Sequence, residues 1–190
     1  MARLERKMTA YYIGDFCRVV LIALPFYLLI RKPWRSWSVR EAALAVFVLF
    51  MIGLWMLTIG VPYKNPVSMI SQALHRIQAG EGINLVPFRT IMRYIRFPDA
   101  DLFLVNVVGN IVMFMPWGFG LVLLWKRKQR LWSVILHALG LTVFIEFVQL
   151  FVDRSVDVDD VILNFLGSSL GAALYFLLRK LFPKLGNLAK

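Results

Sequence analysis

Long apolar runs are the feature that most constrains what this chain can fold into. Three of them, Ala42–Gly60, Leu102–Trp125 and Leu131–Val152, are bounded by charged residues, and Val161–Leu178 is nearly as long. A bilayer core of about 30 Å needs roughly 20 apolar residues per helix, so each run predicts a transmembrane helix. Hydrophobic residues make up 59% of the chain and charged residues 17%, which exceeds the apolar content of a soluble domain.

A further apolar segment, Tyr12–Ile30, carries Asp15 and Arg18 near its start, so its uninterrupted part is only Val19–Ile30. Basic residues follow it where a signal peptide would need a small-residue cleavage site, which predicts a retained anchor. We therefore expect an all-α integral membrane protein with about five transmembrane helices, or a four-helix core if the first segment is re-entrant. The expected domains are an N-terminal anchor helix and basic loop (1–41), a multi-span membrane domain (42–182) and a basic tail (183–190).

The net charge of +11 comes from basic residues grouped at the ends of the apolar runs. This distribution indicates membrane orientation, not nucleic-acid binding. The positive-inside rule predicts that the groups at 31–40, 126–130 and 179–184 are cytoplasmic, together with the C-terminus. The connection 61–101 and the acidic turn Asp153–Asp160 are then expected outside. The N-terminal basic residues fit a re-entrant first segment better than five spans.

Polar residues inside three predicted helices gather near one membrane face, which is the face expected outside. They stand three or four residues apart, which places each set on one side of its helix: Asn106 and Asn110; Glu146 and Gln149; Asp157, Asp160 and Asn164. Polar groups are costly in lipid and often mark function. Two structural alternatives stay open, namely hydrogen bonding between helices and capping of the last helix by Asp157, Asp159 and Asp160.

Glu146 is the most informative of these residues, because it is a carboxylate inside an apolar run. Such a group needs a cationic partner or a protonated state, and Arg154 and Arg89 are the candidate partners. Glu146, Asp157 and Asp160 are also the candidates for catalysis. A single cysteine and two isolated histidines predict no zinc site. The oxygen ligands of Asp153–Asp160 leave a divalent cation open, although we expect no metal and no cofactor.

Four motifs in order make the stretch Ile83–Leu177 similar to the VanZ-like family. They are Asn84-Leu-Val-Pro87-Phe88, Asn106-x3-Asn110-x3-Phe114-x-Pro116-x-Gly118, Glu146-x2-Gln149, and Arg154-x2-Asp157-x-Asp159-Asp160-x3-Asn164-x2-Gly167-x3-Gly171. The resemblance implies a multi-helix protein of the bacterial plasma membrane. In some members of that family it also implies reduced susceptibility to teicoplanin, a lipid-bearing glycopeptide, with no established reaction.

The leading hypothesis is an outward-facing polar site that binds an envelope lipid or a lipoglycopeptide. The expected ligand-binding residues are Arg89, Asn106, Asn110, Glu146, Gln149, Arg154, Asp157, Asp159, Asp160 and Asn164. Two alternatives are a membrane-embedded enzyme acting on a lipid-linked envelope substrate, with Glu146 as general acid or base, and a scaffolding protein. Expected partners are membrane lipids and no nucleic acid, and a homo-oligomer stays open. The helical apolar spacing of Pro66–Ala79 predicts a helix on the membrane surface, or else a plain linker.

Overall fold

The computed structural model describes the chain apart from residues 1, 36–37, 61–64, 98–99, 153 and 190, and it leaves out the side chains of 2–13 and 100. Four helical stretches in the described part are long and apolar enough to cross a membrane: Val39–Thr58, Asp101–Leu124, Leu131–Gln149 and Val158–Leu181. The predicted all-α membrane architecture is confirmed. The chain forms two compact units, Met1–Val61 and Pro62–Lys190, and each is described by itself.

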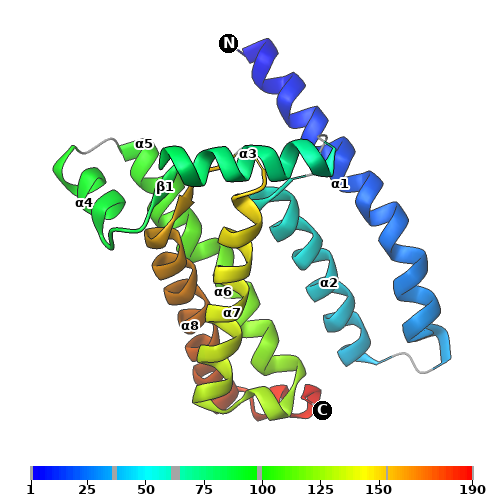
Figure 1. Ribbon diagram of the computed structural model, residues 1–190. Coiled ribbons are helices and arrows are strands. Elements are labelled where there is room, and N and C mark those ends of the chain that lie inside the picture. Colours follow the sequence, from blue (N-terminus) through cyan, green and yellow to red (C-terminus); the bar gives the residue numbers. More distant parts are fainter. Residues whose placement is uncertain (1, 36–37, 61–64, 98–99, 153, 190) are drawn as a thin grey trace. The chain divides into compact units, whose positions relative to one another are not determined.

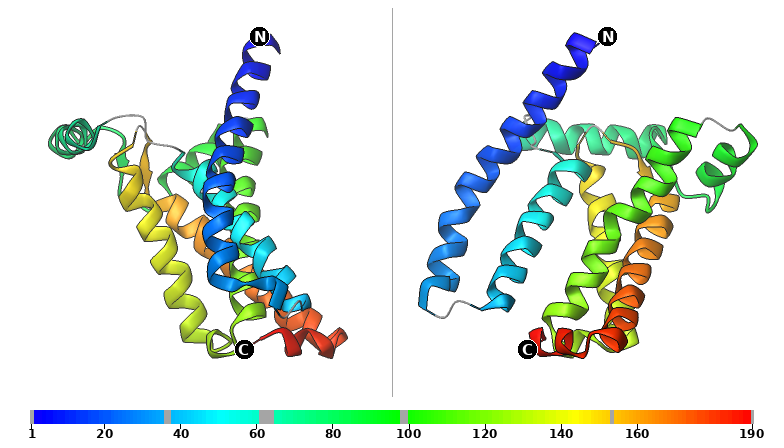
Figure 2. Two further views of the ribbon diagram at one scale, coloured as in Figure 1. Left: turned by 90° about the vertical axis from the view of Figure 1, so that its right-hand side faces the viewer. Right: turned by 180° about the vertical axis from the view of Figure 1, so that it is seen from behind.

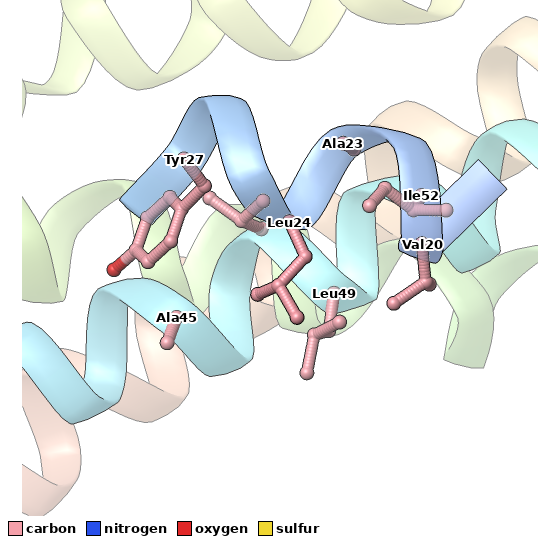
Figure 3. Close-up of a pocket in the computed structure, with 8 residues that line it drawn as sticks. Val20, Ala23, Leu24, Tyr27, Ala45, Leu49 and Ile52 are labelled. Atoms are coloured by element: carbon pink, nitrogen blue, oxygen red, sulfur yellow. The ribbon is translucent and has the colours of Figure 1, made fainter. Parts of the chain in front are cut away.

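The first unit consists of α1 (Ala2–Arg31), a short turn of 3-10 helix (Pro33–Arg35) and α2 (Val39–Thr58). Helix α2 begins where the Ser38 side chain accepts a hydrogen bond from the Glu41 amide at 3.3 Å. The Glu41 carboxylate is paired with Arg31, whose Nε donates to it at 3.2 Å. An apolar pocket between the two helices is lined by residues such as Leu24, Tyr27 and Leu49 (Figure 3). Whether the predicted segment Tyr12–Ile30 spans the membrane stays a prediction.

The second unit is built on the close packing of α6 (Gly109–Leu124) against α8 (Val158–Leu181). Three glycines make this approach possible. A Cβ atom at Gly118 would lie 1.7 Å from the Ser168 carbonyl oxygen, and one at Gly171 would lie 1.9 Å from that of Met115. Gly167 stands equally close to the α6 backbone. Packing through small residues is the usual way in which transmembrane helices approach one another closely.

Helix α6 is preceded by α5 (Ala100–Phe103) and by a π-helical stretch, η2 (Leu104–Val108). Together these three elements form the span predicted as Leu102–Trp125. The sequence pattern carried no sign of the π-helical turns. Such turns are rare, and they occur most often as local bulges within α-helices.

Helix α7 (Leu131–Gln149) packs against α8, and the three helices α6, α7 and α8 stand side by side (Figure 1). At one end of this bundle a cluster forms around the fully buried Tyr175, whose hydroxyl accepts a hydrogen bond from Gln129 at 2.9 Å. The same end carries the short helices η3 (Lys126–Lys128) and η4 (Pro183–Leu188). Leu185, in the predicted basic tail, packs against the cluster.

The other end of the bundle, here called the loop end, is covered by α3 (Pro66–Ala79), β1 (Ile83–Asn84), α4 (Arg89–Arg96) and β2 (Val156–Asp157). Helix α3 runs crosswise to the long helices in Figure 1, and the left-hand view of Figure 2, which looks along α3, shows it beside the end of α7. It begins at the Asn65 cap and ends at Gly80, whose φ of 66° is favourable for glycine. The helix predicted over Pro66–Ala79 is therefore present.

Candidate functional site

The loop end is closed by a two-residue parallel ladder in which Ile83 pairs with Val156 and Asn84 with Asp157. Beside it, the guanidinium of Arg76 donates to five backbone carbonyl oxygens. Those of Gln149, Leu150 and Val152 accept at 3.3, 3.2 and 3.1 Å, and those of Gly82 and Arg154 accept as well. The carbonyls at a helix C-terminus lack intrahelical donors and attract cations. Arg76 thus fixes α3 to the end of α7 and to both strands.

Asp159 anchors the start of α4. Its side chain is fully buried and accepts hydrogen bonds from three backbone amides, those of Phe88, Thr90 (2.7 Å) and Ile91 (3.0 Å). Phe88, which precedes α4, has a φ of 64°, in the left-handed region that non-glycine residues rarely adopt. The carboxylate therefore holds the loop in a conformation that the chain alone would disfavour.

Asp157 joins β1 to α8. Its carboxylate accepts from the Asn84 amide at 2.8 Å and from the Thr90 hydroxyl at 2.5 Å, and it caps α8 by accepting from the Asp159 amide at 2.9 Å. The backbone amide of Asp157 in turn donates to Glu146 at 2.8 Å. The capping alternative raised for the aspartates is thus seen at Asp157.

Glu146, Asp160 and Asn110 come from three different helices to the same place. Glu146 is 5% exposed and lies close enough to Asp157 and Asp160 for their charges to repel. Asp160 accepts from the Asn110 amide at 2.9 Å. One turn along α8, Asn164 is 3% exposed, and its Oδ1 has no hydrogen-bond partner among the described residues. The result is a group of carboxylates and amides at the loop end, in which Glu146 and Asn164 are buried and Asp160 and Asn110 are half-buried.

Some predicted site residues lie apart from this group. Asn106 donates to the Leu102 carbonyl of its own helix at 2.9 Å. The side chains of Arg89 and Arg154 are exposed, and neither forms an ion pair with Glu146 in the part of the chain that the structure describes. The proposed cationic partner of Glu146 is therefore replaced by a backbone amide. Gln149 is buried, with its carbonyl bound to Arg76. Asp153, at the start of the predicted acidic turn, lies outside the described residues.

Sequence reasoning missed Arg76 and Thr90. Neither stands in a periodic polar pattern, and their partners are about 70 residues away along the chain. Asn84 appeared only as a motif residue, although its side chain bonds both Asp157 and Thr90. A local signal for these contacts does not exist, because the ladder that creates them is a long-range feature.

The cluster can bind polar groups and move protons, because it combines buried carboxylates with amide donors. Among the described residues, no group of three or more His, Cys, Asp and Glu side chains is arranged to hold a metal ion.

A family model described as VanZ/LLP1 matches residues 47–179, which include every member of this cluster. Comparisons with curated proteins and with solved structures found no match.

Proposed function

Because this chain belongs to the VanZ/LLP1 family of multi-pass membrane proteins, we propose that it binds an envelope lipid or a similar amphiphile at the loop-end cluster and thereby lowers susceptibility to teicoplanin-type lipoglycopeptides. The protein would reside in a bacterial plasma membrane. The positive-inside rule orients the basic groups near Lys126 and Lys180 toward the cytoplasm, so the loop end would face outward, where such ligands are found.

The observation that carries the proposal is the polar group at the loop end in which Glu146 and Asn164 are buried and Asp160 and Asn110 are half-buried. Burying a carboxylate among apolar helices costs several kcal/mol unless it is compensated, by estimates of about 2.5–3.5 kcal/mol at a bilayer centre. Asp157 and Asp159 are compensated by backbone amides of the loop. The Asn164 Oδ1 is not, and so it is available to accept a hydrogen bond from a headgroup.

The loop above the cluster supports the same proposal. Polar contacts at Asp157, Asp159 and Arg76 hold it in place. A hydrogen-bonded cover can exchange its partners for those of an amphiphile at a lower cost than an apolar one. A ligand reaching the cluster would therefore compete with the loop for the same acceptors.

The test is teicoplanin susceptibility of a sensitive host that expresses wild type, Glu146→Gln or Asp160→Asn at matched membrane abundance. Glu81→Gln is the control, because Glu81 is an exposed acid of the same end. We expect wild type and the control to protect and the two cluster variants to lose protection. Equal protection by all four would reject the site, and protection by none would reject the function.

A second candidate, a membrane-embedded enzyme acting on a lipid-linked substrate, is favoured by one observation. Glu146, which is buried, and Asp160, which is half-buried, are neighbouring carboxylates on different helices, an arrangement that lets one accept a proton while the other donates it. A lipid-linked envelope precursor that is chemically altered by wild-type membranes, and left intact by Glu146→Gln membranes, would favour this reading over simple binding.

A further inference from the structure

Helix α4 carries three arginines on one side. Arg89, Arg93 and Arg96 are four and three residues apart, a spacing that places them on one face of a helix. All three are exposed, and in the described part of the chain the ion pairs belong to other arginines. Three exposed cations within eight residues create a strong local positive potential.

The backbone beneath these arginines is fixed in place. The amides of Phe88, Thr90 and Ile91 are bound to the Asp159 carboxylate, so the first turn of α4 is tied to the start of α8. A cationic face that is held in position before a ligand arrives loses less conformational entropy on binding. Its long arginine side chains need only order their own rotamers.

Exposed apolar side chains accompany the basic face. Met92 and Ile95 of α4 are exposed, and so are Phe88 and Phe97 at its two ends. Across the same end of the bundle, α3 exposes a stripe at helical spacing: Val67, Ile70, Leu74 and Ile77. Because α3 lies crosswise to helices long enough to span the membrane, we expect it to lie along the bilayer surface (Figure 2). Basic residues beside exposed apolar ones are typical of helices that lie in the lipid interface.

We propose that Arg89, Arg93 and Arg96 form a binding site for the phosphate of an anionic phospholipid headgroup. Arginine binds phosphate oxygens in a bidentate manner, and the flanking Met92 and Ile95 contact the upper acyl chain. These apolar neighbours favour a lipid over free phosphate, which would leave them in water. The inference rests on the proposed function in taking a lipid as ligand, and it adds the headgroup chemistry and the residues that select it.

The test measures which lipids lie next to α4. Cys17 is the chain's single cysteine, so a fluorophore on Leu85→Cys, an exposed position shortly before α4, reports on this place alone in a Cys17→Ser background. The labelled full chain is placed in phosphatidylcholine vesicles that hold a small, equal fraction of nitroxide-labelled phosphatidylglycerol or nitroxide-labelled phosphatidylcholine. Quenching by each lipid is then compared for wild type and for the triple variant Arg89→Gln, Arg93→Gln and Arg96→Gln.

The matched control removes the same charge at the far end of the bundle, through Lys126→Gln, Arg127→Gln and Lys180→Gln, all exposed. A second variant replaces the three arginines by lysine, which keeps the charge but not the bidentate geometry. In the wild type and the far-end control we expect the anionic lipid to quench about three-fold more effectively, or better, than the neutral one. The glutamine variant should lose this preference, and the lysine variant should keep part of it.

Equal quenching by the two lipids in wild type would overturn the proposal, as would an unchanged preference in the glutamine variant. No quenching by either lipid would show that α4 does not lie at the bilayer surface and would overturn it too. Loss of the preference on adding inorganic phosphate at constant ionic strength would reveal a site for free phosphate. None of these results depends on teicoplanin susceptibility, so this inference and the proposed function can fail separately.

Discussion

Replacing Gly171 by alanine tests whether the contact between α6 and α8 determines the stability of the second unit. The new Cβ would lie 1.9 Å from the Met115 carbonyl oxygen, whereas a C–H···O contact needs about 3.3 Å. The two helices must therefore separate by about 1.4 Å at this point. The obstacle is backbone, which cannot rotate away as a side chain would.

The expected cost follows from that separation. Forcing an extra methyl group into a packed contact costs about 1–3 kcal/mol. The higher helix propensity of alanine relative to glycine offsets at most about 1 kcal/mol of this cost. A net loss of about 1–2 kcal/mol corresponds to a fall in Tm of roughly 2–8 °C for a chain of this size. Because Gly167 lies in the same contact, a Gly167→Ala, Gly171→Ala double variant should cost less than the sum of the two.

Thermal unfolding in detergent, followed by intrinsic tryptophan fluorescence, measures the effect. Gly140→Ala is the matched control, since a Cβ at Gly140 of α7 would meet no atom within 4 Å. We expect this control to leave Tm unchanged or to raise it slightly. If Gly171→Ala and Gly140→Ala gave the same Tm, the reasoning from the close backbone contact would be refuted.

Three further variants test the loop end and the first unit. Asp159→Ala leaves three loop amides without their acceptor, so hydrogen exchange of the amides at residues 88–91 should speed up at least ten-fold, which corresponds to a loss of about 1.4 kcal/mol or more. Unchanged exchange would show that Asp159 does not hold the start of α4. Arg76→Lys keeps the charge but leaves only three donors for five carbonyl oxygens, so the protein should lose about 1–3 kcal/mol of stability and its Tm should fall. An unaltered Tm would show that the Arg76 contacts do not stabilise the loop end. A double-mutant cycle of Arg31→Gln and Glu41→Gln should show a coupling of about 0.5–1 kcal/mol in unfolding of the first unit, whereas strict additivity would mean that the pair contributes nothing.

The helices of the second unit could be predicted from the sequence because their signal is local. Apolar runs locate α6, α7 and α8 to within a few residues, and the helix over Pro66–Ala79 follows from its 3.6-residue periodicity. The exact starts depend on caps: α8 begins at Val158, three residues before the predicted Val161, because the Asp157 side chain accepts a hydrogen bond from the Asp159 amide in its first turn. The sequence indicated Asp157 as a possible cap, but it did not show at which residue the helix begins.

The candidate site could be predicted only in part. Glu146, Asp160 and Asn110 meet as their shared depth in the bilayer indicated, because depth follows from position along each helix. The hydrogen bonds of Arg76 and Thr90 could not be inferred, because their acceptors are distant in the sequence and come close only in the folded chain. Of the two alternatives for Glu146, a cationic partner is not seen among the described residues, and the backbone amide of Asp157 in β2 donates to its carboxylate.

The pairing of β1 with β2 sets an order on biogenesis. Asn84 and Asp157 are 73 residues apart, and α6 and α7 lie between them in the chain. Strand β1 is therefore synthesised well before its partner, and it must wait until both intervening helices have entered the membrane and the turn after α7 has emerged. Contacts of such high sequence separation form late, because the intervening chain has first to be ordered. A nascent chain that stops before residue 156 would therefore have α6 and α7 in the membrane while the loop end is still open.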